Sequence, residues 1–130
     1  MCGFYFRIDR SNSLTLDKEL HIKKKLSSRG SDVFKSIKGT HNEFRYYASH
    51  SRLIISGDKK HGVQPFITKK NLLLFNGQIY NFRKLEEIHS IKKSKSDTEF
   101  LSLFFDKYPF EYCCQNLEGP FSILFFDFRK

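Results

Sequence analysis

The sequence predicts a single α+β domain spanning residues 1–130, and three observations carry this prediction. Segments rich in β-branched and aromatic residues alternate in blocks with segments of helical periodicity, and not as the regular βαβ units of a doubly wound sheet. No internal repeat, Pro-rich linker or low-complexity tail divides the chain. Hydrophobic residues make up 39% and charged residues 28% of the sequence, which is typical of a folded globular domain.

The first half is expected to contain strands and one surface helix. Residues 3–8 are rich in aromatic and β-branched side chains and predict a strand that begins at the amino terminus. Residues 14–26 carry leucines near helical spacing with polar residues between them, which predicts a surface helix. Residues 44–48 and 52–56 predict two β-rich runs on either side of residues 50–51.

In the second half, a turn signal and a helix-capping signal guide the prediction. Asn76-Gly77 lies between the β-rich residues 72–75 and 79–80, the arrangement of a hairpin. Ser96-Asp97-Thr98-Glu99 has the pattern of a capping box and predicts a helix with a buried face. A second helical turn is expected over 111–116, and 121–128 is expected to be a long buried strand.

Composition argues against several classes of protein. No stretch approaches the roughly 18 apolar residues of a membrane span, and no signal segment is recognisable, so we expect a cytoplasmic protein with no membrane partner. The net charge of +9 comes from scattered lysines and not from an arginine-rich patch, so we expect no nucleic-acid partner. The three cysteines, Cys2, Cys113 and Cys114, lack the spacing of a disulfide framework or a C-x-x-C metal site, so no metal site is predicted.

Cys2 is the candidate nucleophile. Methionine is generally removed from chains whose second residue is small, and removal of Met1 would give Cys2 a free α-amine. The pKa of an α-amine is about 7.7 to 8.0, close to the thiol pKa of about 8.5, so one residue can supply both the sulfur and a base for its proton. A buried structural cysteine is the competing interpretation of Cys2 alone.

A set of motifs, in order along the whole chain, resembles the class II glutamine amidotransferases, and most closely the glutaminase domain of asparagine synthetases. The motifs are Met1-Cys2-Gly3, Arg29-Gly30 with Asp32, His50-Ser51-Arg52-Leu53-Ile54-Ile55, Gln64-Pro65, Asn76-Gly77-Gln78-Ile79-Tyr80-Asn81, Ser96-Asp97-Thr98-Glu99 and Leu117-Glu118-Gly119-Pro120-Phe121. The resemblance implies the four-layer α/β/β/α sandwich of N-terminal-nucleophile hydrolases. It also implies hydrolysis of glutamine to glutamate and ammonia through a thioester on Cys2.

The resemblance assigns further roles by position. Asn76 and Gly77 would form the oxyanion hole, although an Asn-Gly turn also explains them. Arg52 would bind the α-carboxylate of glutamine and Asp97 its α-ammonium, whereas a surface charge and a helix-end residue are the competing interpretations. The remaining substrate-binding positions would be Leu53, Ile55 and Gln78.

Three departures from the family pattern qualify these expectations. Gln78 stands where asparagine synthetases usually have Glu, and Ser28-Arg29-Gly30-Ser31-Asp32 replaces His-Arg-Gly-Pro-Asp. The family's further strands would follow Lys130, so we expect a carboxyl-terminally truncated domain with an uncovered sheet edge. We expect no cofactor here, and ATP and Mg²⁺ only on a synthetase domain or partner that uses the ammonia. A degenerate glutamine-binding or regulatory domain without turnover is the alternative.

Overall fold

The computed structural model describes residues 2–11, 14–53 and 62–130. The chain divides into two compact units, Met1–Lys59 and Lys60–Lys130. Each unit has its own three-stranded sheet, and every strand pairing in both sheets is antiparallel. Antiparallel sheets combined with helices confirm the predicted α+β class. Within the described residues, no helix combines the length and apolar character that crossing a bilayer requires.

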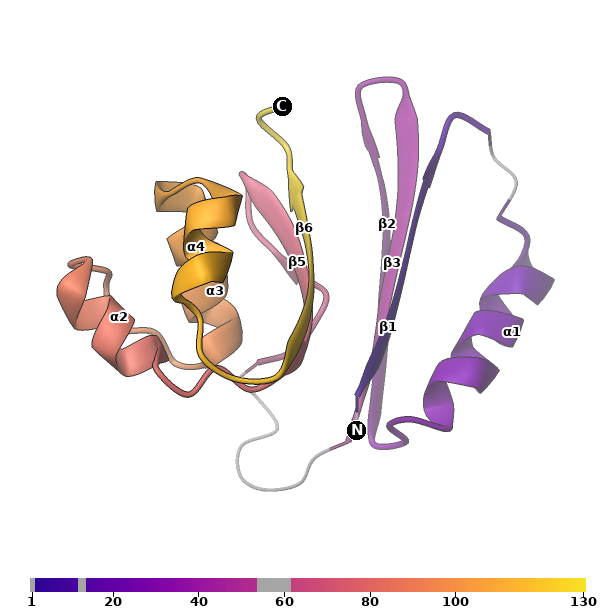
Figure 1. Cartoon of the computed structure of the whole chain (residues 1–130). Coiled ribbons are helices and arrows are strands. Elements are labelled where there is room, and N and C mark those ends of the chain that lie inside the picture. The colour runs from indigo at the N-terminus through magenta and orange to yellow at the C-terminus, as the bar shows by residue number, and fades with distance from the viewer. Residues whose placement is uncertain (1, 12–13, 54–61) are drawn as a thin grey trace. The chain divides into compact units, whose positions relative to one another are not determined.

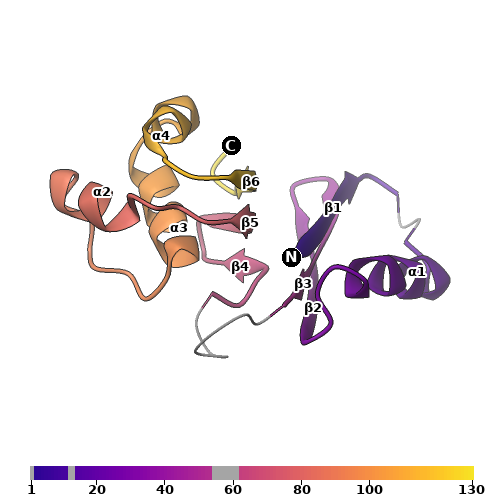
Figure 2. The same ribbon diagram turned by 60° about the horizontal axis from the view of Figure 1, so that its bottom comes forward.

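The first unit consists of one sheet and one helix. Its elements are β1 (Gly3–Asp9), α1 (Leu16–Ser27), β2 (Val33–His41) and β3 (Phe44–Arg52). β3 is the central strand, and Gly3 of β1 and Phe34 of β2 both face Ser51 in the ladders. Figures 1 and 2 show α1 lying over one face of this sheet.

The predicted surface helix is confirmed as α1. It begins after Thr15, whose side-chain oxygen accepts a hydrogen bond from the N–H of Lys18 at 3.4 Å, the usual device for satisfying a first-turn donor. No residue of α1 is buried, and Leu16 and Leu20 are exposed.

β3 is one continuous strand, so the prediction of two runs interrupted at residues 50–51 is wrong. Phe44–Arg52 pairs with β1 along one side and with β2 along the other. A central strand gains ladder hydrogen bonds on both sides, and this outweighs the low β propensity of its Ser and His residues. Residues 54–56, which complete the second predicted run, lie outside the described residues.

The second unit combines a sheet with three helices. Its strands are β4 (Phe66–Ile67), β5 (Asn71–Gly77) and β6 (Phe121–Asp127), in the order β4-β5-β6. Its helices are α2 (Phe82–Ile88), α3 (Asp97–Lys107) and α4 (Phe110–Asn116), and they lie over one face of the sheet (Figures 1 and 2). The core cluster contains Leu73, Phe75, Ile79, Leu85, Phe100, Leu101, Phe104, Phe105, Cys113 and Leu117.

Asn76-Gly77 does not form the predicted hairpin. β5 ends at Gly77 and pairs with β4 and β6, and the chain then enters α2 instead of a second strand. The Asn-Gly pair does mark the end of a strand, but the strands that pair with β5 are determined by long-range contacts and not by this turn. β6 has the predicted position but is only partly buried, and Phe121 at its start is 38% exposed.

Each sheet has a second face that also carries apolar side chains. In β5, Leu73 and Phe75 belong to the helix-facing core, so the alternate residues Leu72 and Leu74 lie on the opposite face. In the first unit, a Cβ on Gly3 would meet Leu26 of α1, so the alternate residues of β1 such as Phe6 lie on the face away from α1.

Candidate functional site

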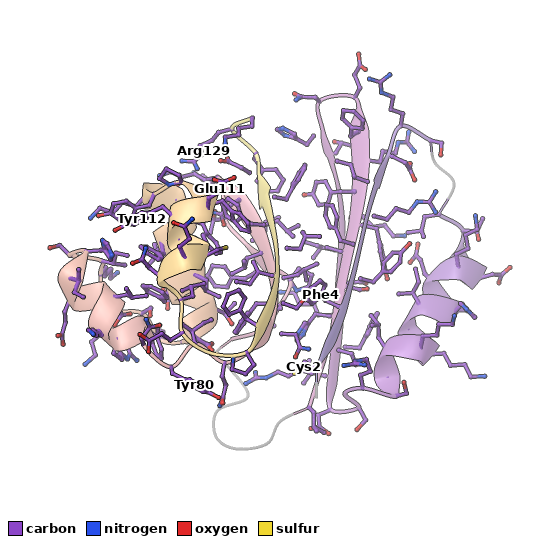
Figure 3. All side chains as sticks on the ribbon, in the orientation of Figure 1. Cys2, Phe4, Tyr80, Glu111, Tyr112 and Arg129 are labelled. Carbon is purple, nitrogen blue, oxygen red and sulfur yellow. The ribbon has the colours of Figure 1, made fainter. Side chains whose placement is uncertain are left out.

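Cys2 immediately precedes β1 and lies at the end of the first sheet where β3 finishes. The next residue, Gly3, is paired with Ser51, the neighbour of Arg52 in β3. The Cys2 thiol is free and partly accessible, and Figure 3 shows the residue at the start of β1. The strand pairing therefore brings two predicted site residues, Cys2 and Arg52, to the same end of the sheet.

The turn after α1 is fastened to the amino terminus by Arg29. Its Nε donates a hydrogen bond to the backbone carbonyl of Cys2 at 3.4 Å. A Cβ on Gly3 would lie 3.0 Å from Cδ of Arg29, so glycine at this position lets the arginine stem pack closely over the chain. Arg29 thus holds the backbone that carries the candidate nucleophile.

The same turn packs against the end of β3 through Gly30. A Cβ there would lie 2.6 Å from the carbonyl carbon of Arg52 and 2.7 Å from the nitrogen of Leu53. The Ser51 hydroxyl donates to the carbonyl of Gly30, and the N–H of Asp32 donates to the carbonyl of Arg52 at 3.1 Å. The predicted binding residues Arg52 and Leu53 therefore lie on backbone that the turn supports, with Leu53 36% exposed.

Ile55, the remaining predicted binding residue of this unit, lies outside the described residues.

The second unit contains the Asn76-Gly77-Gln78 segment at the end of β5. Gly77 has φ = +143°, and a Cβ there would lie 2.8 Å from Cα of Phe121 and closer still to the carbonyl oxygen of Pro120. Only glycine therefore fits this position. The N–H of Gln78 donates to the carbonyl of Pro120 at 3.0 Å, which fixes the chain just beyond the candidate oxyanion hole.

Asp97 is brought to this segment although it is almost 20 positions further along the chain. It is the first residue of α3, and its Oδ1 accepts the N–H of Thr98 at 2.8 Å. Its carboxylate also accepts the backbone N–H of Ile79, which follows Gln78 directly. The fold therefore joins the predicted ammonium-binding residue to the Asn76-Gly77-Gln78 motif.

The electrostatics of Asp97 are unusual for a residue in the first turn of a helix. Burial raises the pKa of its carboxyl above the ordinary value, and the hydrogen bonds from Thr98 and Ile79 only partly oppose the shift. A partly desolvated carboxylate that lacks full compensation favours an approaching cation, so this position suits an ammonium group.

The predicted capping box is confirmed and supports Asp97. Ser96 Oγ accepts the N–H of Glu99 at 3.2 Å, while Glu99 Oε2 accepts the N–H of Lys95 at 2.7 Å. Glu99 reaches one residue further back than the usual box, and the result still satisfies two donors at the start of α3.

Two residues that support the candidate residues of the second unit were not predicted in these roles. The buried side chain of Gln64 accepts the N–H of Phe75 at 2.6 Å, beside the candidate oxyanion residue Asn76. Glu86 is buried on α2 and binds the connection that leads to Asp97. The Gln64-Pro65 motif was a usable signal for the first, whereas Glu86 has the local sequence of an ordinary surface residue.

The other two cysteines have environments that disfavour the thiolate. Burial raises the pKa of the Cys113 thiol to about 12, and the neighbouring Cys114 adds to the shift. Burial and then Glu111 raise the pKa of Cys114 above its ordinary value. Within the described residues, no three His, Cys, Asp or Glu side chains are grouped so that they could hold a metal ion.

The predicted site residues are divided between the two units. Cys2, Arg52 and Leu53 belong to the first, whereas Asn76, Gly77, Gln78 and Asp97 belong to the second. Each group is coherent within its own unit: one pairs a thiol with an arginine-bearing strand end, and the other pairs a glycine-dependent turn with a carboxylate.

Comparison with known proteins gives two findings. The family described as "Glutamine amidotransferase domain" matches residues 1–130. A "Probable asparagine synthetase (glutamine-hydrolyzing)" of Acanthamoeba polyphaga mimivirus is 28% identical over 130 residues, covering 98% of this chain and 24% of the relative. The chain thus spans about a quarter of the length of that relative. The family resemblance predicted from the motifs is confirmed.

Proposed function

Because the chain belongs to the glutamine amidotransferase domain family, we propose that it hydrolyses glutamine to glutamate and ammonia with Cys2 as the nucleophile. The observation that carries the proposal is the match of the family over the whole chain. Cys2 also lies at the same end of the first sheet as Arg52. The other two thiols are poor candidates because the pKa of each is raised.

The proposed reaction has two balanced steps. Cys2 Sγ attacks the side-chain amide carbon of glutamine, and its proton passes through the α-amine to the leaving nitrogen, which departs as ammonia. This step leaves a γ-glutamyl thioester on Cys2. Water then adds to the thioester carbonyl, the C–S bond breaks, and glutamate and the free thiol are released. The α-amine of Cys2 becomes available as the base once Met1 is removed.

The developing negative charge on the amide oxygen needs hydrogen-bond donors. The side-chain amide of Asn76 and the backbone N–H of Gly77 are the proposed pair. The tight packing of Gly77 against Pro120 and Phe121 supports this role, because a rigid donor costs no reorganisation during the reaction. One such donor is worth about 3 to 4 kcal/mol of barrier in comparable sites.

Substrate selection is proposed to use both charged ends of free glutamine. Arg52 can form a bidentate pair with the α-carboxylate, and Asp97 can bind the α-ammonium. The partly buried, hydrogen-bonded carboxylate of Asp97 supports this assignment. Leu53, Ile55 and Gln78 are the proposed neighbours of the substrate's remaining atoms.

The finer architecture is proposed to be the four-layer α/β/β/α sandwich. Each unit supplies a sheet that has helical structure over one face, α1 in the first unit and α2–α4 in the second. The opposite face of each sheet carries apolar side chains, such as Phe6 in β1 and Leu72 in β5. Stacking two such faces would bury both sets of side chains.

The ammonia is proposed to serve an ATP-dependent amidation like that of asparagine synthetases, on a synthetase domain or partner that carries the ATP and Mg²⁺. The similarity to a probable asparagine synthetase four times as long supports this assignment. Aspartate is the first acceptor to test.

The proposal is tested by measuring glutamate release from glutamine by purified protein whose amino terminus has been checked by mass spectrometry. We expect turnover by the parent and by Cys114→Ala, a matched thiol control on α4. We expect none with Cys2→Ala and a loss of about 100-fold or more with Asn76→Ala. A folded, correctly trimmed parent that binds glutamine without turnover, even with a synthetase partner, would contradict the proposal and indicate a degenerate glutamine-binding domain.

A further inference from the structure

Glu86 is a buried carboxylate whose two oxygens are both used. Its residue exposure is 6%, although it belongs to the short helix α2. Oε1 accepts the N–H of Ser94 at 2.8 Å and also the Ser94 hydroxyl, while Oε2 accepts from Nη1 of Arg83 at 2.9 Å. The same Nη1 donates to the carbonyl of Ser94 at 2.8 Å. Glu86 and Arg83 together therefore form hydrogen bonds with both the N–H and the C=O of Ser94.

The hydrogen bonds of Glu86 compensate for its burial. Burying a carboxylate is unfavourable unless hydrogen bonds replace its water. Burial raises the pKa of Glu86, but the bonds from Ser94 and Arg83 outweigh this effect and lower the pKa overall, so the group remains ionised. The conformation of Ser94 is thus strongly specified.

The specified loop leads directly into Asp97. The next N–H along the chain, that of Lys95, is captured by Glu99 of α3 at 2.7 Å, so two carboxylates from two helices hold consecutive residues. Asp97 follows two positions later and bonds to Ile79, a member of the core cluster. The carboxylate of Asp97 is therefore placed between one fixed point in the loop and another in the core.

We propose that Glu86, with Arg83 and Ser94, acts as a positioning residue that sets Asp97 for recognition of the α-ammonium of glutamine. The inference rests on the proposed glutaminase function. Glu86 acts through Asp97 and not on the reacting atoms, so it governs substrate affinity and selectivity for the ammonium group. Displacements of about 1 Å at such contacts are costly, which explains the use of a buried carboxylate.

The test is Glu86→Gln, which retains the shape of the side chain but places an amide donor against the donors of Ser94 and Arg83. We expect a rise of about tenfold in KM for glutamine with kcat nearly unchanged. The value of kcat/KM should stay constant for glutaramate, the glutamine analogue that lacks the α-amino group. Glu87→Gln is the matched control, because Glu87 is the adjacent exposed residue of the same helix.

A coupling experiment separates positioning from general stability. In an Asp97→Asn background, Glu86→Gln should cause no further rise in KM, because the group that it positions has been neutralised. Equal losses on glutamine and glutaramate, or full additivity with Asp97→Asn, would overturn the inference. If Glu86→Gln fails to fold, Ser94→Ala can be used, because it removes only the hydroxyl contact. It should give a smaller rise in KM for glutamine and again leave kcat/KM for glutaramate unchanged.

Failure of the inference can be distinguished from failure of the proposed function. A parent without glutaminase activity defeats the function, whereas an active parent with an unselective Glu86→Gln variant defeats only the positioning role. Amide hydrogen exchange provides a readout that needs no turnover. The N–H groups of Ser94 and Thr98 should exchange faster in Glu86→Gln than in Glu87→Gln, and equal exchange in the two variants would overturn the positioning role.

Discussion

Gly30 and Arg52 lie in direct backbone contact, and a Cβ on Gly30 would stand 2.6 Å from the carbonyl carbon of Arg52. The residues are far apart in the sequence, yet this contact joins the turn beside Cys2 to the strand end that carries the proposed carboxylate-binding arginine. The hydrogen bond from Asp32 to Arg52 reinforces the same junction.

Gly30→Ala should therefore damage both stability and glutamine use. The added methyl group meets backbone atoms of Ser51, Arg52 and Leu53, which no side-chain rotation can move away. We therefore expect a loss of about 1 to 3 kcal/mol in the free energy of unfolding and a higher KM. Denaturant melts and steady-state kinetics measure the two effects. Gly39→Ala is the control, because the nearest atoms to its added methyl group belong to the ring of Tyr46, which can move. Equal losses of stability and of glutamine affinity in the two variants would argue against a special role for the contact between Gly30 and Arg52.

Asp97→Asn should weaken glutamine binding and stabilise the fold near neutral pH. The pKa of Asp97 is raised in the folded state, so the stability cost of its ionisation grows from the ordinary pKa up to the folded-state pKa. The cost is complete above the folded-state pKa and is absent in acid, where the carboxyl is protonated in both states. Asparagine removes this cost. The gain in Tm should accordingly fade as the pH is lowered through the folded-state pKa.

The binding loss in Asp97→Asn should be on the order of 2 kcal/mol, or about 30-fold in KM, because an ion pair with the ammonium is lost. Asp17→Asn, which changes an exposed aspartate in the first turn of α1, is the control for both measurements. An Asp97→Asn variant that is less stable at neutral pH but unchanged in acid would contradict the assigned sign of the shift.

Gln78→Glu should improve glutamine binding. Gln78 is exposed and lies directly before Ile79, whose N–H binds Asp97, so a carboxylate there would add a second negative charge near the ammonium. Because the position is exposed, the expected gain is modest, about threefold in KM. Gln115→Glu makes the same charge change at an exposed position of α4, and an equal gain there would indicate a general charge effect.

The three thiols should differ in reactivity. Iodoacetamide should label Cys2 first in the folded protein, and glutaminase activity should fall in step with that label. Cys113 should react only after unfolding, because burial raises the pKa of its thiol to about 12. Peptide mass spectrometry at successive times gives the order; rapid labelling of Cys113 in the native protein would contradict its assigned environment.

The sequence predicted those helices and strands whose formation depends on residues close together in the chain. The start of α3 could be predicted because Ser96 and Glu99 form their contacts within one helical turn. β2 was not predicted. It is an edge strand in which lysine, serine and glycine interrupt the apolar residues, and its order comes from pairing with β3. α2 was missed because it is only seven residues long and follows a motif typical of hairpins.

Candidate site residues could be proposed from the sequence only where they lie in a recognisable motif. The resemblance predicted Cys2 and Asp97 as site residues, but neither the Ile79–Asp97 hydrogen bond nor the burial of Glu86 has a local signal in the sequence. Both depend on segments more than seven positions apart in the chain, which only the folded arrangement brings together.

The most direct test of the account is to look for the γ-glutamyl thioester on Cys2. Protein incubated with glutamine is quenched in acid, digested, and its amino-terminal peptide is weighed by mass spectrometry. We expect the γ-glutamyl adduct on Cys2 during turnover, its disappearance when glutamine is exhausted, and its absence from Asp97→Asn at low glutamine. Glutamate release that continues in Cys2→Ala would contradict the central claim.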